Sequence, residues 1–368
     1  MKIGYDVSQT CSSKSGTGFY ADQLIRAIAK QDMGNEYYLL PRFYDYIQGE
    51  DERATTVEQQ NFKNVVVQEF SDKDEFFGCL DIVHSNNFRY PKDIQAKKVV
   101  TIYDVSFMDR PEFTTEANRM FCFRGTFDSV MNADIIVAIS EYTKERIKYY
   151  FPYINDDRIR VVHGGNRYTL LGEKENVETI MEYGLTSGEY FLSVGTIEPR
   201  KNYETLLKAY RDYKESNRNG YKKLCIAGGY GWMEENFSAK IKKYGIENDV
   251  VITGYVSDNV LANLYRYCYA YVYTTWYEGF GLPVLEAMNF AKPIIASNVT
   301  SVPEVAGEAA ILKNPENYGE FASAMDELAR DESLYDKMCG LSAERAKVFS
   351  WDNAAEKMIS IYNELGAK

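Results

Sequence analysis

Short apolar runs alternate with longer amphipathic stretches along the chain. Most of the apolar runs are continuous and rich in Val and Ile, which is typical of strands buried on both faces of a parallel sheet. We expect strands at residues 2–7, 36–41, 64–70, 81–84, 97–104, 134–140, 158–163, 189–195, 222–228, 249–255, 270–275, 292–297 and 309–313. Helical periodicity predicts helices over 18–30, 115–132, 141–150, 201–215, 233–244, 258–267, 283–290 and 316–330. This alternation favours doubly wound α/β sheets.

Thirteen strands are too many for one sheet of ordinary size, so the pattern predicts two sheets, each a Rossmann-like domain. The natural break is the polar segment Gly164–Gly188, which lacks a strand pattern and is rich in Gly and charge. Doubly wound sheets bind ligands beyond the carboxyl ends of their strands. Two such sheets facing each other would form a cleft, so the chemistry is expected on the loops that follow the strands.

Composition narrows the class of protein. The 368 residues carry a net charge of −12, shared by both halves, so bulk attraction to nucleic acid or anionic lipid is not expected. The six Cys are scattered and there are only two His, so no metal site is predicted. The N-terminus has a strand pattern rather than that of a signal peptide, and no apolar run reaches the roughly 18–20 residues of a membrane span. These features predict a cytoplasmic protein with reduced thiols.

The segment FLSVGTIEPRKN (191–202) is the first candidate for chemistry. A predicted strand ends at Gly195, and the adjacent cations Arg200 and Lys201 are expected to open the next helix. Arg provides a bidentate fork and Lys a point charge, and a helix N-terminus adds backbone donors. The pair therefore suits a phosphate group, although a solvated basic pair at a helix start is the alternative.

The segment TTWYEGFGLPVLEAMNFAKP (274–293) is the second candidate. Glu278 follows a predicted strand, two glycines then allow close approach of backbone to a ligand, and Pro283 marks a helix start. Backbone N–H groups near Gly281 and Leu282 would point at an anion. Glu278 could accept sugar hydroxyl groups, and Glu286, about one turn into the helix, could accept those of a ribose. Helix punctuation with two surface carboxylates is the alternative.

The order of these motifs resembles that of the retaining glycosyltransferases of family 4, which have the GT-B fold. The segments that carry the resemblance are VGTIEPRKNYETLLKAY, ITGYVSDNVLANLY (252–265), EGFGLPVLEA, VTSVPEVAGEAAILKNP (299–315) and FSWDNAAEKMISIY (349–362). Glu278 and Glu286 match the E-x7-E motif of that family. The resemblance implies an acceptor-side domain at 1–168, a donor domain at 169–350, and a helix at 351–368 that crosses back to the N-terminal domain.

The resemblance also implies roles for matching residues. Arg200 and Lys201 would neutralise the donor diphosphate without a metal ion, and Glu278 would hold the transferred sugar. The loop after Gly254 would line the base pocket. The implied donor-binding residues are Gly16, Thr17, Gly18, Thr196, Val256, Gly279, Phe280, Gly281, Leu282 and Glu286.

The glycine-rich segment SKSGTGFYADQLIRAIA (13–29) requires a second interpretation, because it reads G-x-G-x-x-A before a predicted helix. A dinucleotide fingerprint of this type has its glycines in a tight turn after a strand. Here they lie about eight residues beyond the strand, and the acidic residue that should end the next strand, Glu36, begins it. The position facing the transferred sugar, implied by the resemblance, fits better than NAD binding.

The segment VVTIYDVSFMDRPEF (99–113) departs from the family pattern. Asp104 ends a predicted strand and is a catalytic candidate. The family usually has a His just before it, where this chain has Tyr103, and a Tyr cannot act as a His base near neutral pH. Tyr103 and His84, which ends another predicted strand, are the acceptor-side candidates.

The resemblance implies a retaining, metal-independent hexosyltransferase that uses a GDP- or UDP-linked sugar, with mannose as the candidate sugar, in surface-polysaccharide synthesis. The acceptor is expected to be a glycan or a lipid-linked glycan. The amphipathic segment 140–151 leaves peripheral contact with the inner face of the membrane open. A nucleotide-sugar epimerase and a catalytically weak nucleotide-sugar-binding subunit are the alternatives. A glycosidase pair of Glu278 and Glu286 is disfavoured by the glycine turn between them.

Overall fold

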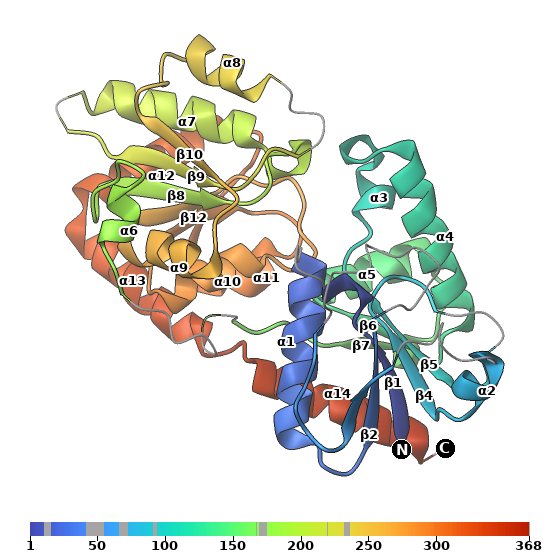
Figure 1. Ribbon diagram of the computed structural model, residues 1–368. Helices are drawn as coiled ribbons and strands as arrows, with labels where there is room; N and C mark the ends of the chain where they lie inside the picture. The colour runs from blue at the N-terminus through green and yellow to red at the C-terminus, as the bar shows by residue number, and fades with distance from the viewer. Residues whose placement is uncertain are drawn as a thin grey trace. The chain divides into compact units, whose positions relative to one another are not determined.

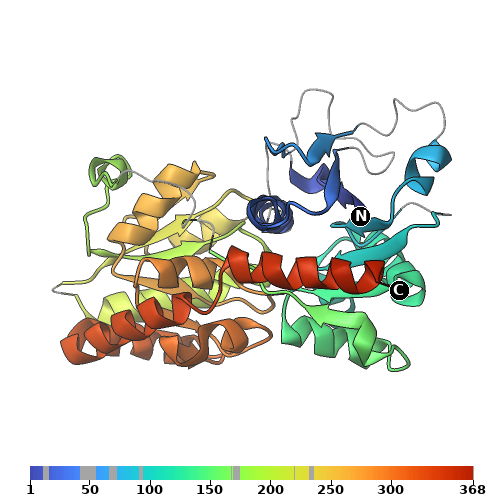
Figure 2. The ribbon, with the colours of Figure 1, turned by 90° about the horizontal axis from the view of Figure 1, so that it is seen from below.

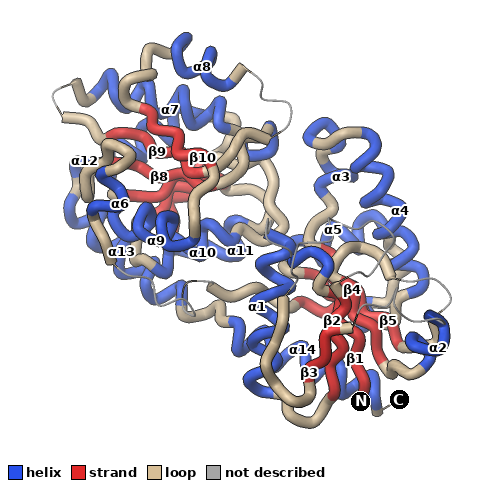
Figure 3. The backbone as a smooth tube through the Cα atoms, viewed as in Figure 1, coloured by secondary structure: helices blue, strands red, loops and turns tan. Residues whose placement is uncertain are grey.

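The structure is a computed structural model that describes residues 1–10, 16–41, 55–65, 73–90, 94–166, 168, 175–218, 220–231 and 236–367. The chain divides into two compact units, Met1–Gly165 with Ser350–Lys368, and Asn166–Phe349. Each unit is described by itself. Both have the layered arrangement of strands and helices seen in Figures 1 and 3.

The first unit contains a parallel sheet with seven described strands in the order β3-β2-β1-β4-β5-β6-β7 (Figure 3). The strands are β1 Lys2–Asp6, β2 Glu36–Leu40, β3 Phe62–Asn64, β4 Ile82–Ser85, β5 Lys97–Ile102, β6 Ile135–Ala138 and β7 Ile159–Val161. Ile3, Val83, Val100 and Ile136 are fully buried, because helices cover both faces of the sheet. This burial explains why the strands read as continuous apolar runs.

The helices of the first unit include a segment from the far end of the chain. They are α1 Gly16–Gln31, α2 Lys73–Gly78, α3 Ser106–Asp109, α4 Glu116–Asn132, α5 Glu141–Tyr150 and α14 Trp351–Gly366. The C-terminal helix α14 packs across α1. In Figure 2, α1 is seen nearly along its axis. Trp351, Ala355, Met358 and Tyr362 on one face of α14 are buried. The predicted return of the C-terminal helix to the N-terminal domain is therefore confirmed.

The second unit contains a parallel sheet with six described strands in the order β10-β9-β8-β11-β12-β13. The strands are β8 Tyr190–Val194, β9 Lys223–Ala227, β10 Val250–Gly254, β11 Ala270–Tyr273, β12 Ile294–Ser297 and β13 Ala310–Lys313. The helices are α6 Glu178–Met181, α7 Tyr203–Ser216, α8 Phe237–Lys243, α9 Asp258–Tyr267, α10 Leu282–Asn289, α11 Val302–Ala306, α12 Tyr318–Arg330 and α13 Glu332–Ala346.

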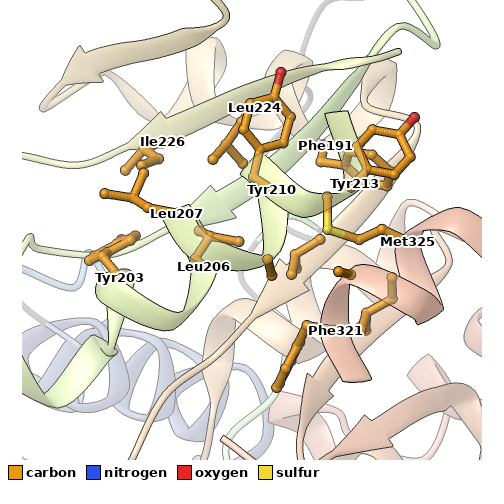
Figure 4. Close-up of a cluster of buried hydrophobic side chains, with 14 of the residues drawn as sticks. Phe191, Tyr203, Leu206, Leu207, Tyr210, Tyr213, Leu224, Ile226, Phe321 and Met325 are labelled. Carbon is orange, nitrogen blue, oxygen red and sulfur yellow. The ribbon is translucent and has the colours of Figure 1, made fainter. Parts of the chain in front are cut away.

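The core of the second unit lies between this sheet and the helices α7 and α12 (Figure 4). Leu206, Leu207 and Tyr210 of α7 meet Leu224 and Ile226 of β9, which are all fully buried. The burial of such side chains supplies most of the free energy that holds the layers together. Because α7 is fixed in this way, the loop between β8 and α7 starts and ends at rigid points.

Thirteen strands of the predicted pattern are present, in two sheets, so the two Rossmann-like domains are confirmed. The strand expected at 64–70 is found at Phe62–Asn64, and residues 66–70 lie outside the described part of the chain. The 15-residue helix α13 was not predicted, because its apolar side chains do not form one stripe. Cys11, residues 13–15 of the glycine-rich segment, 233–235 of a predicted helix, and 167 and 169–174 of the polar break also lie outside the described residues.

The chain passes from one unit to the other at Gly165–Asn166 and again at Phe349–Ser350. The expected bounds were 168 and 350, so Asn166 and Tyr168 belong to the second unit instead of the first. At this boundary a Cβ atom added to Gly165 would overlap backbone atoms of Ser350 and Trp351. Only a glycine at position 165 lets the start of α14 approach the backbone this closely.

We predict that Gly165→Ala destabilises the first unit by about 1–3 kcal/mol, because backbone has to move to admit the methyl group. The matched control is Gly340→Ala, in the middle of α13, where the added Cβ would meet nothing within 4 Å. That substitution should stabilise by about 0.5–1 kcal/mol through helix propensity. Urea unfolding of both variants tests whether the changes in unfolding free energy have these opposite signs. Equal effects would contradict the close approach at Gly165.

Candidate functional site

Polar and glycine residues gather at the carboxyl ends of four neighbouring strands in the second unit. In the order of the sheet these are β10, β9, β8 and β11. The ends carry Gly254 to Val256 after β10, Gly228 to Gly231 after β9, Gly195 to Lys201 after β8, and Thr274 to Glu278 after β11. This edge is where parallel α/β sheets bind ligands, as the sequence predicted.

The two predicted cations lie in a short 3₁₀ turn, Pro199–Lys201, between β8 and α7. Asn202 then adopts a left-handed conformation with φ of 52°, and α7 begins at Tyr203. The expectation that Arg200 and Lys201 open the helix is therefore wrong, because both lie in the 3₁₀ turn that precedes α7. The Asn202 side chain donates to the Pro315 carbonyl at 3.1 Å, which stabilises a conformation that Asn tolerates better than most residues.

The turn brings Arg200 and Lys201 onto one carboxylate. Arg200 Nη1 lies 3.0 Å from Glu278 Oε2, and Lys201 Nζ lies 2.7 Å from Glu278 Oε1. Arg200 Nη2 also lies 2.6 Å from Glu198 Oε1. Glu198, Lys201 and Glu278 are all buried, so the four side chains form a compact cluster of zero net charge. Burying these charges is tolerable only because each has an opposite charge in hydrogen-bonding distance.

The charges of the cluster are set by its ion pairs. Burial alone would raise the pKa of the Glu278 carboxyl, but the nearby Arg200 and Lys201 outweigh burial and lower that pKa to about 2. Burial lowers the pKa of the Lys201 ammonium, and Glu278 opposes the decrease. Glu278 is therefore ionised at neutral pH and acts as the counter-ion of both cations.

Lys201 is held in place by further contacts. Its Nζ donates to Tyr273 Oη at 2.7 Å and to Glu278 Oε1 at 2.7 Å. Tyr273 is the last residue of β11 and is buried. A Cβ atom at Gly195 would come within 3.1 Å of Lys201 Cε. The glycine at this strand end therefore leaves space for the lysine side chain. An ammonium group has three hydrogens, and these contacts use two of them.

Glu278 is positioned from both sides. Its Oε1 also accepts from Thr275 Oγ1 at 2.9 Å, and its backbone N–H donates to Thr300 Oγ1 at 3.0 Å. Ser301 Oγ donates to the Glu278 carbonyl at 2.9 Å. Oε1 is thus saturated, while Oε2, which faces Arg200, keeps room for a second donor. A hydroxyl group of a ligand could be that donor.

The glycine loop after Glu278 leads into α10. Gly281 has φ of 98° and precedes the first residue of the helix, with Pro283 in the first turn. Glu286 on this helix is buried and accepts from Tyr265 Oη at 2.9 Å. The side chain of Phe280 is buried edge-on against Phe349, with ring centroids 5.5 Å apart. The Phe280 side chain therefore anchors the glycine loop in the interior. Its predicted contact with the donor could be made only by its backbone.

The remaining predicted donor residues of this unit lie along the same edge. Thr196 is exposed, and a Cβ atom at Gly231 would come within 2.6 Å of its methyl group. Val256 is half-buried and follows Gly254, which forms a bridge with Gly228 of the next strand end. The loops after β8, β9 and β10 are therefore in mutual contact.

The predicted residues of the first unit gather at the carboxyl ends of β1, β4 and β5. Tyr103 is buried and donates from Oη to the carbonyl of Thr17 at 3.2 Å, so the structure brings it to the start of α1 with Gly16 and Gly18. Burial raises the pKa of Tyr103, which therefore stays protonated. Asp104 Oδ1 accepts from the backbone N–H of Ser106 at 2.9 Å and from its hydroxyl at 2.8 Å.

His84 does not serve as an acceptor-side residue in this structure, contrary to the prediction. The side chain is fully buried, and both ring nitrogens have partners: Tyr362 Oη of α14 at 2.6 Å and Thr101 Oγ1 at 2.8 Å. Burial lowers the pKa of the imidazole to about 3, so the ring is neutral. His84 instead ties the C-terminal helix to β4 and β5.

Four residues of this candidate site escaped the sequence analysis: Glu198, Tyr265, Tyr273 and Thr275. Glu198 carried a signal, since it stands two residues before Arg200 and a partly buried arginine needs a counter-ion. Tyr273 and Tyr265 looked like ordinary apolar positions of a strand and a helix. Only the arrangement of β11 beside β8 shows that Tyr273 meets Lys201.

Two further properties of the described residues bear on the expected chemistry. Among the described residues, no group of three or more His, Cys, Asp or Glu is arranged to hold a metal ion. Across the same residues, every helix is too short or too polar to pass through a lipid bilayer.

Comparison with known proteins identifies relatives. The family model of the glycosyl transferases group 1 matches residues 181–343, which include the whole charge cluster. The O-antigen chain mannosyltransferase B of Escherichia coli is 30% identical over 285 residues, which cover 77% of this chain and 74% of that protein.

Solved structures share the fold along the full chain. The sucrose-phosphate synthase of Thermosynechococcus elongatus superposes with a TM-score of 0.76 at 18% identity, covering 100% of this chain and 99% of that one. Alr3699/HepE of Anabaena, in complex with UDP-glucose, gives 0.74 at 15% identity, covering 99% and 100%. The architecture is thus the GT-B fold, as predicted.

We predict that Glu278→Gln lowers the free energy of unfolding at pH 7 by about 3 kcal/mol, because two cations lose their shared counter-ion. The pKa of Glu278 is depressed in the folded state, so its stabilising contribution is present above the ordinary carboxyl pKa and is lost as the pH falls toward 2. The difference between the two proteins should therefore be smaller at pH 3 than at pH 7 in urea unfolding.

The control for this prediction is Glu344→Gln on α13, which removes one charge from an exposed ion pair with Lys347, just beyond the end of that helix. It should leave the stability nearly unchanged, since solvent screens exposed pairs. A loss as large as that of Glu278→Gln, or a Glu278→Gln effect independent of pH, would contradict the buried counter-ion role.

Proposed function

The chain belongs to the glycosyl transferases group 1, and we propose that it transfers a mannosyl residue, with retention, from a nucleoside-diphosphate donor to a growing surface polysaccharide. The observation that carries this proposal is the buried cluster of Glu198, Arg200, Lys201 and Glu278 at the sheet edge. The mannosyl group and the glycan acceptor are suggested by the name of the Escherichia coli relative.

The cluster suits a diphosphate group that leaves during the reaction. Lys201 has one ammonium hydrogen beyond its contacts with Tyr273 and Glu278, and Arg200 remains partly accessible. Charge grows on the diphosphate as the bond to the sugar breaks, so fixed cations stabilise the transition state more than the ground state. We propose that these two residues supply that stabilisation without a metal ion.

The carboxylates would orient the rest of the donor. Glu278 Oε2 can accept a hydroxyl group of the transferred sugar while Arg200 stays bound to the same oxygen. Glu286 lies eight residues further on, in α10, and its contact with Tyr265 fixes one oxygen. We propose that Glu286 binds the ribose and that Thr196, Gly279, Gly281, Leu282 and Val256 contact the donor with backbone or side chain. The base, guanine or uracil, would lie beyond them toward Val256; UDP-glucose binds the Anabaena protein.

The first unit would supply the acceptor side. Gly16, Thr17 and Gly18 begin α1, and the bond from Tyr103 to Thr17 fixes this start. We propose that Asp104 faces the reacting sugar and that Tyr103, which stays protonated, offers hydrogen bonding without acting as a base. His84 has no place in this proposal, because both its nitrogens are used inside the fold.

A donor panel tests the proposal. The protein is incubated with GDP-mannose, GDP-glucose, UDP-glucose and UDP-N-acetylglucosamine, with and without a mannan oligosaccharide, and the products are analysed by mass spectrometry and NMR. Mannose transfer that forms an α-linkage from an α-linked donor supports it. Isomerised donor without transfer would show an epimerase, and tight donor binding without turnover would show a binding subunit. Loss of activity in EDTA would refute metal independence.

We predict that Lys201→Ala lowers kcat by about 100-fold or more with a smaller change in donor affinity, because the lysine acts on charge that develops in the transition state. Glu286→Ala should instead weaken donor binding by about 10-fold or more through the lost charged hydrogen bonds. Kinetics and calorimetry with the active donor separate the two effects. Lys243→Ala, at the end of α8, is the control for a removed lysine. Parent-like behaviour of both site variants would refute the site.

A further inference from the structure

Helix α4 of the first unit presents large apolar side chains to solvent. Phe123, Phe127 and Met131 are 41%, 45% and 59% exposed, and the two phenylalanine rings stack with centroids 6.3 Å apart. They stand four residues apart, so they form one ridge along the helix. Phe127 also contacts Phe151, which extends the apolar surface past the end of α5. A contiguous patch of this kind on a folded unit marks an interaction surface.

The inward face of the same helix is small and polar by comparison. Gly125, Thr126, Ser129 and Val130 are its buried residues, and the Ser129 hydroxyl donates to the Phe88 carbonyl at 2.6 Å. The usual distribution of an amphipathic helix, with its large apolar residues facing the core, is therefore reversed on α4. The large side chains contribute little to the core of their own unit.

Two oppositely charged side chains lie beside the ridge. Arg124 and Asp128 follow Phe123 and Phe127 by one residue each, so they lie on the same side of it. They stand four residues apart on one helix, yet no ion pair or hydrogen bond of either side chain occurs among the described residues. Both ends of a possible ion pair are thus available to a partner.

We propose that α4 is a dimerisation surface whose exposed face binds α4 of a second copy of this chain, antiparallel about a two-fold axis at the height of residue 126. Such an axis places residue i of one helix opposite residue 252 − i of the other. Arg124 then lies opposite Asp128 of the second copy, and Asp128 opposite Arg124. The two ion pairs follow from the symmetry itself.

The same axis interlocks the apolar ridges. Phe123 of one copy falls at the height of position 129, halfway between Phe127 and Met131 of the other. Phe127 falls at the height of position 125, halfway between Phe123 and Phe127. Ridges of residues four apart pack into one another in this manner in the commonest class of helix contacts. One register therefore satisfies both the charges and the side-chain packing.

The charge balance favours a second copy over a membrane surface as the occupant. Helix α4 carries Arg119 and Arg124 against Glu116 and Asp128, so its net charge is zero. Arg119 is also paired with Glu116 at 2.8 Å, and on α5 Lys144 and Lys148 share Asp156. Binding to anionic lipid needs an excess of available cations around the apolar side chains. This surface has self-complementary charges instead.

Charge exchange on α4 tests the proposal. Sedimentation velocity of the full chain over micromolar concentrations should show a reversible dimer. Arg124→Asp brings acidic residues opposite each other, and Asp128→Arg brings arginines opposite each other, so each should weaken the dimer at least tenfold. The double variant R124D/D128R restores opposite charges in the proposed register and should recover most of the affinity. A merely destabilised helix would not regain dimerisation in the double variant.

Phe127→Glu should abolish the dimer. Lys337→Asp on α13, which changes the charge by the same amount as Arg124→Asp, should leave the dimer intact. Circular dichroism checks that each variant is folded. A parent chain that is monomeric at all concentrations overturns the proposal, as does a dimer in which R124D/D128R is no better than the single variants. A monomer that sediments with vesicles of phosphatidylethanolamine and phosphatidylglycerol, and loses this with Phe127→Glu, would assign the surface to the membrane instead.

Discussion

The candidate site at the sheet edge of the second unit is organised by a single carboxylate shared between two cations. Glu278 binds Arg200 through one oxygen and Lys201 through the other, and Glu198 supplies the second negative charge. Buried charges are costly unless all of them are paired, so the turn at Pro199–Lys201 and the loop after β11 have to be placed together. The left-handed Asn202, the glycine at 195 and the hydroxyl groups of Thr275, Thr300 and Ser301 all serve that placement.

This arrangement also bears on the proposal that a cluster of zero net charge binds an anionic donor. The two cations are fixed and partly desolvated before a ligand arrives, so little reorganisation remains for the reaction itself. Their counter-ions are side chains of the protein, so the charges of the cluster are balanced within the fold. The family membership shows that the reaction is a glycosyl transfer, and the cluster offers a physical reason for a leaving diphosphate at this edge.

The first unit follows a different principle, in which a distant part of the chain completes the fold. Helix α14 packs on α1, and His84 binds Tyr362 on one side and Thr101 on the other. The ring is neutral and enclosed, so a residue that resembled a ligand-facing histidine serves as a structural one. Helix α4 on the same unit turns its large apolar side chains outward, which no internal packing requirement explains.

The sequence by itself determined the strand pattern, the two parallel sheets and the strand ends that carry the candidate site, because strands buried on both faces leave continuous apolar runs. It also identified Arg200, Lys201, Glu278 and Glu286 by motif. The partners Glu198, Tyr273 and Tyr265, the buried state of His84 and Phe280, and the outward face of α4 emerged only from tertiary structure. Those features depend on which helices and strands become neighbours in the fold. Local periodicity along the chain does not specify these neighbours.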